Sequence, residues 1–135
     1  MYTKIIDNTT DKKAPLIYII SVGVEGDPMY TQYIGKSSKG VSRPLKAYPK
    51  CVSNYKNNKF RKTYKKGGGA IVGTRPAWRK HVHVPLYEAM QSNKSITLTM
   101  FNVKLEEIDA IEQRMISEFV NVYGKERCMN AQHTK

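Results

Sequence analysis

The sequence predicts an α+β protein in which a small three-stranded antiparallel sheet is flanked by helices and interrupted by a long basic loop insertion. Three runs rich in β-branched and aromatic residues supply the strands, and an amphipathic stretch near the C-terminus supplies the clearest helix. The insertion is indicated by a glycine-containing basic stretch that lacks apolar periodicity. At 135 residues, the chain has the size of one domain that can bury a core without disulfides.

The composition along the chain predicts its organisation. Residues 1–14 are polar and are expected to form a flexible N-terminal arm. A domain over residues 15–130 follows, with a basic insertion at about residues 50–80, and residues 131–135 form a tail. The longest apolar run is about half the length that a membrane-spanning helix needs, so no membrane contact is expected. Two cysteines, interpreted as free thiols, favour a cytoplasmic location.

The first half of the domain is predicted to begin with a hairpin. Residues 16–24 form an apolar run typical of a buried strand, and residues 29–35 are its expected antiparallel partner across the turn sequence EGDP. A short helix is expected to begin at Ser42, with Pro44 near its first turn. It is expected to stop at Pro49, because proline lacks the N–H group that a helix interior needs.

The second half is predicted to begin with a long mobile loop over residues 54–78, which contain three successive glycines. A short helix over residues 85–91 and a third strand over residues 96–103 are expected to follow. Residues 104–123 predict the clearest helix, because most of their apolar side chains fall on one broad arc at 100° steps.

Glu112 falls near the middle of the apolar arc of this last helix. A carboxylate in such a place is costly unless it is paired, protonated or bound to a metal. Two interpretations stay open. Glu112 is either a structural ion-pair partner of one of the many basic groups, or a metal ligand or acid–base group that projects into a basic cleft.

The net charge of +12 comes entirely from the middle of the chain. Residues 28–87 contain 14 Lys and Arg side chains with interleaved aromatics, and no Asp or Glu. Such a field attracts polyanions, since cations neutralise phosphates and aromatic faces stack on bases. Double-stranded DNA is the expected partner. The side chains expected to contact it are Lys46, Lys56, Lys59, Arg61, Lys62, Lys65, Lys66, Arg75, Arg79 and Lys80.

Leu-Ile-Tyr at residues 16–18, followed by Tyr-Ile-Gly-Lys at residues 33–36, resembles the signature of the GIY-YIG nuclease superfamily. The spacing of Arg43 after this signature, the helix that carries Glu112, and the later Asn130 are also similar to the family pattern. The resemblance covers about residues 15–130 and implies a GIY-YIG-like fold.

The sequence departs from the family pattern at two positions that concern the site. Leu16 stands where the family has its first glycine. Ala47 lies four residues after Arg43, where the family often has His or Tyr, and Tyr48 comes directly after it.

The resemblance implies a metal-dependent endonuclease that hydrolyses DNA, by nicking or by double-strand cleavage. By resemblance, Glu112 binds Mg²⁺, for which Mn²⁺ is the expected substitute, and Arg43 contacts the phosphate. The general base is Tyr18 or Tyr33, with Lys36 lowering its pKa, since an unperturbed tyrosine titrates near about pH 10. The residues expected to support the site are Gly35, Tyr48 and Asn130.

Other interpretations stay open beside this one. The chain could be a catalytically inactive nucleic-acid-binding module of the same fold, or a basic adaptor for an acidic protein. Tyr18 and Tyr33 could be core tyrosines, and Lys36 a plain phosphate contact. A homo-oligomer, a dimer or a tetramer, is also left open, because two sites would help to cut both strands.

Overall fold

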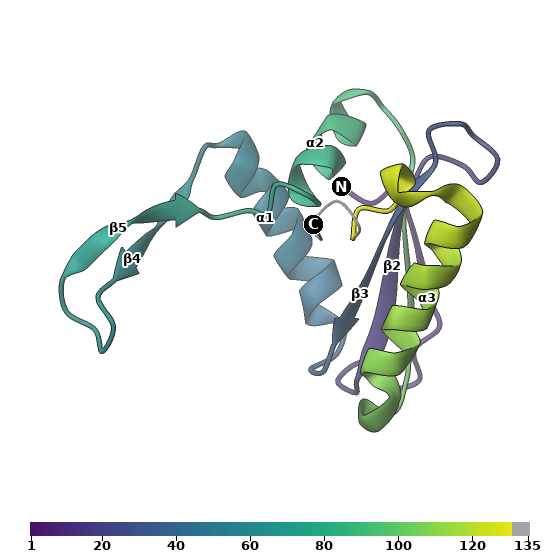
Figure 1. Cartoon of the computed structure of the whole chain (residues 1–135), viewed down its shortest axis with the longest axis horizontal. Coiled ribbons are helices and arrows are strands. Elements are labelled where there is room, and N and C mark those ends of the chain that lie inside the picture. Colours follow the sequence, from purple (N-terminus) through teal and green to yellow (C-terminus); the bar gives the residue numbers. More distant parts are fainter. Residues whose placement is uncertain (131–135) are drawn as a thin grey trace.

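In the computed structural model, which describes residues 1–130, a four-stranded sheet of order β1-β6-β2-β3 lies between two layers of helices. Its strands are β1 (Lys4–Asp7), β2 (Leu16–Val22), β3 (Thr31–Ser37) and β6 (Ile96–Asn102). The α-helices are α1 (Tyr48–Lys56), α2 (His83–Gln91) and α3 (Ile108–Tyr123). Helices α1 and α2 lie on one side of the sheet and α3 on the other (Figure 1), which confirms the α+β class.

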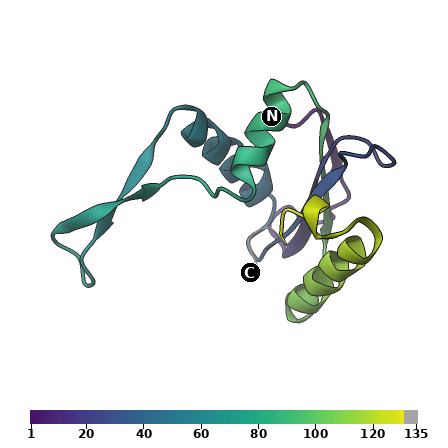
Figure 2. The ribbon, with the colours of Figure 1, turned by 45° about the horizontal axis from the view of Figure 1, so that its top comes forward.

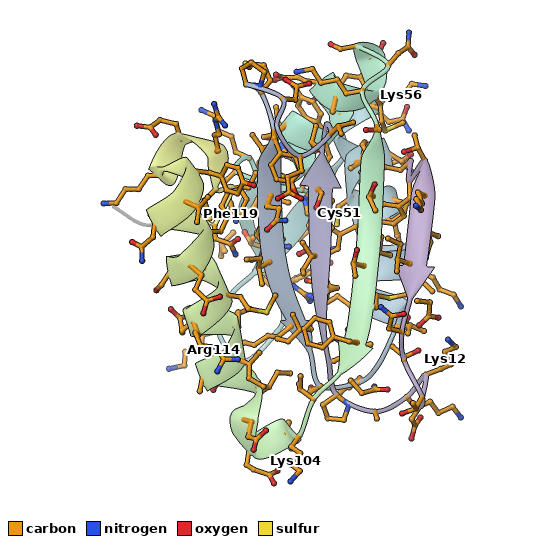
Figure 3. The ribbon with its side chains drawn as sticks, turned by 90° about the vertical axis from the view of Figure 1, so that its right-hand side faces the viewer. Lys12, Cys51, Lys56, Lys104, Arg114 and Phe119 are labelled. Carbon is orange, nitrogen blue, oxygen red and sulfur yellow. The ribbon has the colours of Figure 1, made fainter. Side chains whose placement is uncertain are left out.

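Strand β2 lies at the centre of the core because it is buried on both faces of the sheet. Successive side chains of a strand point to opposite faces. Leu16 and Tyr18 accordingly belong to the apolar cluster on the side of α1 and α2. Ile17 belongs to the cluster that α3 completes with Ile108 and Phe119. Figure 3 shows α3 beside the strands.

Two predictions are corrected by one finding, an additional strand within residues 1–14. The sheet was predicted to have three antiparallel strands, and residues 1–14 were predicted to form a flexible arm. Strand β1 lies inside that arm and pairs with β6 in parallel, so the sheet has four strands and is mixed. The backbone N–H of Thr3 donates to the Ile96 carbonyl at 2.8 Å, and that of Asn8 to the Met100 carbonyl at 2.9 Å. A four-residue edge strand with largely exposed side chains carries little apolar signal, so the composition did not indicate it.

The predicted mobile loop is a β-hairpin instead. Its strands are β4 (Phe60–Tyr64) and β5 (Ile71–Pro76), and it extends away from the rest of the molecule in both views (Figures 1 and 2). Nearly all its side chains are exposed, so no alternation of apolar and polar residues is required. The glycines that suggested mobility form the hairpin turn, where Lys65 N–H donates to the Ala70 carbonyl at 2.9 Å. The basic insertion is therefore shorter than predicted, because α1 continues to Lys56.

The predicted helix stop at Pro49 is also wrong. A π-helical segment, η1 (Arg43–Ala47), leads directly into α1, and Pro49 lies in the first turn of α1. In π-helical spacing the carbonyl of Pro44 would be paired with the N–H of residue 49, which proline lacks. The hydroxyl of Tyr2 donates to that carbonyl at 2.6 Å instead. The N-terminal residues thus satisfy a carbonyl that Pro49 cannot pair with, and proline is tolerated in the first turn of a helix.

The remaining elements lie close to their predicted positions. Helix α2 begins two residues before its predicted start, and β6 ends one residue before its predicted end. A short 3₁₀ turn, η2 (Leu105–Glu107), precedes α3, and another, η3 (Lys125–Arg127), follows it. Within residues 1–130 no helix has both the length and the apolar composition needed to cross a membrane.

The contact between Tyr18 and Gly35 determines the shape of the sheet edge. The two residues are directly opposite each other in β2 and β3, and the Tyr18 ring lies over Gly35. A Cβ atom at residue 35 would overlap the ring and its hydroxyl. Only glycine therefore lets the Tyr18 hydroxyl extend across edge strand β3.

Replacing Gly35 with alanine is expected to lower the free energy of unfolding by about 1–3 kcal/mol, because the Tyr18 ring or the strand must move. The measurement is urea-induced unfolding of both proteins. Gly73→Ala is the matched control, since a Cβ there would meet only the Thr63 side-chain oxygen at 3.3 Å in the exposed hairpin. That control should change stability by less than about 0.5 kcal/mol. Equal effects of the two substitutions would contradict the role assigned to Gly35.

Candidate functional site

A cluster of three tyrosines and two arginines lies on the side of the sheet that α1 and α2 cover. The hydroxyls of Tyr18 and Tyr48 are 2.7 Å apart, and Arg43 Nε donates to the Tyr18 hydroxyl at 3.3 Å. Arg79 donates through Nη2 to the Tyr48 hydroxyl at 2.6 Å and through Nη1 to the Tyr33 hydroxyl at 3.3 Å. The structure therefore brings together Tyr18, Tyr33, Tyr48 and Arg43, as predicted, and adds Arg79. These five residues are called the tyrosine–arginine cluster.

The π-helical segment η1 places Tyr48 in this cluster. In an α-helix the residue stacked on Arg43 would be Ala47, four positions later. The π-helical turn contains one extra residue, and the N–H of Tyr48 donates to the Arg43 carbonyl. The ring of Tyr48 consequently faces the guanidinium of Arg43, whose Cζ is 6.0 Å from the ring centre. Residue spacing alone did not reveal that Tyr48 takes the position of Ala47.

Burial keeps the phenols of Tyr18 and Tyr48 protonated in the free chain. Burial raises the pKa of Tyr18 above the ordinary tyrosine value, while its hydrogen bonds with Tyr48 and Arg43 act in the opposite direction. Burial also raises the pKa of Tyr48. The guanidinium groups are the cations beside these hydroxyls, and a cationic donor favours the ionised form of an acceptor.

Lys36 does not belong to this cluster, contrary to its predicted role in lowering the pKa of a tyrosine. It is three residues from Tyr33 on β3 and so points to the opposite face of the sheet. Its ammonium group is 2.5 Å from Asp109 Oδ1 and 3.7 Å from Glu112 Oε1. The structural ion-pair interpretation of Glu112 thus has a defined partner.

Glu112 lies on α3, with Asp109 one turn before it. The residue is only 9% exposed, and burial raises the pKa of its carboxyl although the charge of Lys36 opposes this effect. Its charged form is therefore less favourable in the folded chain than in water. An ion pair 3.7 Å long does not fully compensate for that burial.

Edge strand β3 lies between the tyrosine–arginine cluster and the charged residues near α3, and it contributes a side chain to each. The tyrosine–arginine cluster lies on one of its faces, and Glu112, Asp109 and Lys36 lie on the other. Asn130 binds the outer edge of the strand: its Oδ1 accepts from Ile34 N–H at 2.8 Å, and its Nδ2 donates to the Ile34 carbonyl at 2.7 Å. Asn130 therefore holds the edge strand that carries Tyr33 and Gly35, and its site-supporting role stays a prediction.

Two histidines beside the cluster were not assigned to the site from the sequence. His83 Nδ1 accepts a hydrogen bond from the backbone N–H of Arg79 at 2.7 Å, which fixes the base of the Arg79 side chain. Burial and then the charge of Arg79 lower the pKa of His83 to about 3, so the imidazole is neutral at physiological pH. The ring of His81 lies 6.2 Å from that of Tyr33. Arg79 itself was predicted only as a DNA contact, because nothing in the sequence shows that the hairpin returns to the tyrosines.

The residues predicted to bind DNA occupy three parts of the structure. Lys46 and Lys56 lie on η1 and α1, while Arg79 and Lys80 follow the hairpin. The other members of the set lie in the hairpin or directly before it, and they are Lys59, Arg61, Lys62, Lys65, Lys66 and Arg75. Most of the predicted DNA contacts are thus concentrated on one projecting arm.

The carboxylates of α3 could supply only part of the coordination of a magnesium ion. Among residues 1–130, no three His, Cys, Asp or Glu side chains gather to form a complete metal site. Glu112 is a hard oxygen ligand with Asp109 nearby, and Mg²⁺ commonly binds one or two carboxylates and completes its coordination with water and substrate phosphates. A metal at Glu112 would therefore need the phosphate of a bound substrate.

Comparison with known proteins gave no match from which the site could be interpreted. A scan against protein-family models, a search of curated proteins and a search of solved structures each gave no match. The candidate residues are consequently those described above: phenols with guanidinium donors on one face of β3, and a buried carboxylate on the other.

The raised pKa of Glu112 predicts a pH dependence of stability. Between its ordinary and its raised pKa, the folded chain keeps a proton that the unfolded chain has released, so stability falls as pH rises through this window. Glu112→Gln removes the charge and is expected to become increasingly stable relative to wild type over the same window. The measurement is the free energy of unfolding of both proteins, without divalent metal, from about pH 3 to about pH 8.

The matched control is Glu118→Gln on the same helix. Glu118 is exposed and paired with Arg114, so its substitution should produce no such trend. A wild-type protein that instead gains stability over Glu112→Gln as pH rises would show that the pair with Lys36 outweighs burial. Glu112 would then be a structural ion-pair partner.

Proposed function

We propose that this chain is a metal-dependent endonuclease of the GIY-YIG type that hydrolyses phosphodiester bonds of DNA. The observation that carries the proposal is the placement of the Tyr18 hydroxyl, which extends across Gly35 to within 3.3 Å of Arg43 Nε. A hydroxyl and a guanidinium at a strand edge, with a buried carboxylate on the other face of that strand, provide the groups that phosphodiester hydrolysis requires.

In the proposed reaction, a water oxygen attacks phosphorus while the bond from phosphorus to the leaving sugar oxygen breaks. Arg43 donates to the phosphoryl oxygens, on which negative charge increases. Solvent water first takes the phenol proton of Tyr18 or Tyr33, the two candidates, and the resulting phenolate oxygen takes the proton of the attacking water. A solvent water protonates the leaving sugar oxygen. Each phenol receives a hydrogen bond from a guanidinium, Tyr18 from Arg43 and Tyr33 from Arg79, and such a donor stabilises a phenolate.

Glu112 is the residue that would hold Mg²⁺, with Mn²⁺ as an alternative metal, and Asp109 lies within one turn of it. A bound divalent ion would supply Lewis acidity at a phosphate oxygen. The role of Lys36 in this proposal is to pair with the carboxylates until the metal and the substrate are bound, since its ammonium group contacts both of them.

The partner is proposed to be double-stranded DNA, bound by the hairpin and the basic residues at its base. The acid-free middle of the chain supports this assignment. Cys51 and Cys128 are free thiols, as predicted, and they favour the reducing cytoplasm as the place of action. A dimer or tetramer would bring two sites to the two strands of a duplex.

A second candidate function is nucleic-acid binding without cleavage. One observation favours it: Glu112 already has a cationic partner, and it faces away from the tyrosine–arginine cluster. A module of this kind would bind DNA with the same dependence on salt and would leave supercoiled plasmid intact with either metal.

Arg43→Ala is expected to reduce cleavage of supercoiled plasmid about 10²–10³-fold in the presence of Mg²⁺, because a charged donor to the transition state is lost. Arg43→Lys should restore only part of the rate, since lysine cannot form the bidentate contact. Arg114→Ala, which removes an exposed arginine from the outer side of α3, is the control and should cut normally. A fully active Arg43→Lys protein would reduce the role of Arg43 to its charge.

Glu112→Gln is expected to abolish metal-dependent cleavage while DNA affinity stays nearly unchanged, because the proposed metal ligand is lost but the hairpin is not. Plasmid nicking and DNA binding are measured on the same preparation, with Glu118→Gln as the control. Cleavage by Glu112→Gln at the wild-type rate would exclude this residue as the metal ligand.

The hairpin is expected to supply most of the phosphate contacts. Each lost contact should lower the slope of log affinity against log salt by about 0.9. The fourfold change of Arg61, Lys62, Lys65 and Lys66 to alanine should therefore flatten that slope and weaken binding to all DNA sequences. A salt titration compares it with a control that removes four exposed lysines outside the basic stretch, namely Lys4, Lys13, Lys94 and Lys104. Equal slopes for the two variants would show that the hairpin is not the DNA-binding surface.

A further inference from the structure

A pocket of about 520 Å³ lies between α1, the base of the hairpin and the start of α2. Four arginines line it, Arg43, Arg61, Arg75 and Arg79, and among the described residues its lining contains no Asp or Glu. A water molecule in liquid takes up about 30 Å³, so the pocket has room for many water molecules. A phosphate group with its neighbouring sugar can take their place. We call it the arginine pocket.

Two of these arginines come from the hairpin and face each other. Arg61 of β4 and Arg75 of β5 are directly opposite in the strand register, so their side chains lie on the same face of the hairpin. Like charges in this position destabilise a strand pair. An anion between the guanidinium groups would remove that repulsion, since arginine binds phosphate oxygens through parallel N–H donors.

The base of the hairpin is attached firmly to α1, which holds the pocket in shape. The side chain of Asn54 is buried and its Nδ2 donates to the Ala77 carbonyl at 3.2 Å, while the N–H of Ala77 donates to the Lys59 carbonyl at 3.1 Å. The ring of Trp78 lies 5.3 Å from that of Tyr55 and 5.2 Å from that of Phe60. These contacts fix the backbone at the base of the hairpin, which carries Arg61 and Arg75, relative to α1.

We propose that the arginine pocket binds a non-scissile phosphate of the DNA backbone and so fixes the strand relative to the reacting group. Arg43 and Arg79 belong to the pocket and to the tyrosine–arginine cluster, so a strand in the pocket continues directly to the Tyr18 hydroxyl. Arg61 and Arg75 act only in the pocket. This inference rests on the proposed nuclease function for the identity of the ligand, and the pocket itself is tested without cleavage.

The test uses Trp78, the only tryptophan of the chain, which lines the pocket. Its fluorescence is followed while sodium phosphate replaces sodium chloride at constant ionic strength, and calorimetric titration of the same solutions provides a second measurement. The wild-type protein should show saturable binding of phosphate, and a short DNA duplex should compete with it. Arg61→Ala together with Arg75→Ala should weaken phosphate binding at least about tenfold.

The matched control removes two charges outside the pocket and outside the basic stretch, through Lys94→Ala and Lys104→Ala. Both lysines are exposed. This control should bind phosphate as wild type does. Arg61→Lys with Arg75→Lys keeps the charge but loses the bidentate donors, and an intermediate affinity is expected.

Three results would overturn the inference. Phosphate binding that does not saturate would show only a general response to salt. An equal loss of phosphate affinity in the Arg61/Arg75 variant and in the control variant would show that only the net charge of the chain attracts phosphate. Saturable phosphate binding with which duplex DNA does not compete would show a site for a free anion. If the protein binds phosphate and DNA as expected but never cuts plasmid, the arginine pocket is supported and the proposed nuclease activity is rejected. Failure of the pocket proposal and failure of the proposed function can therefore be distinguished.

Discussion

The ring of Tyr18 lies over Gly35, and the arrangement of the candidate site depends on this contact. Tyr18 belongs to the buried centre of the sheet, where a hydroxyl would have no access to a ligand. Because the opposite residue has no side chain, the ring crosses the edge strand and its hydroxyl contacts Tyr48 and Arg43. The absence of a side chain at residue 35 thus connects the buried centre of the sheet with the candidate site at its edge.

Edge strand β3 also keeps opposite charges apart. Arg43 and Arg79 contact neutral phenols, whereas the carboxylates of α3 contact Lys36 on the other face. If Glu112 lay beside Arg43, the two would form a strong pair and the guanidinium would have few donors left for a substrate. Separation by a strand leaves the arginines with unused donors and leaves Glu112 buried at an energetic cost. Such a cost is typical of groups that are retained for chemistry.

The elements with a strong local pattern were predictable from the sequence. The three apolar strands, the helix that carries Glu112 and the grouping of Tyr18 with Tyr33 and Arg43 all follow from periodicity, or from spacing together with the family resemblance. Features that depend on distant partners were not predictable. Strand β1 pairs with β6, about 90 residues later, and the Pro44 carbonyl beside Pro49 is satisfied by the distant hydroxyl of Tyr2. The hairpin was mistaken for a loop because an arm that buries neither face needs no apolar alternation.

The parallel pairing of β1 with β6 has a consequence for how the chain is made. Strand β1 leaves the ribosome well before β6, the strand that it pairs with, and Thr3 and Ile96 are 93 positions apart. The carbonyl of Pro44 is satisfied by Tyr2 from the same early segment. Until residues 96–102 emerge, residues 4–7 lack their sheet partner, so the sheet closes only after that point of synthesis. An incomplete product released by early termination would thus carry the arginines of the site without the fold that aligns them.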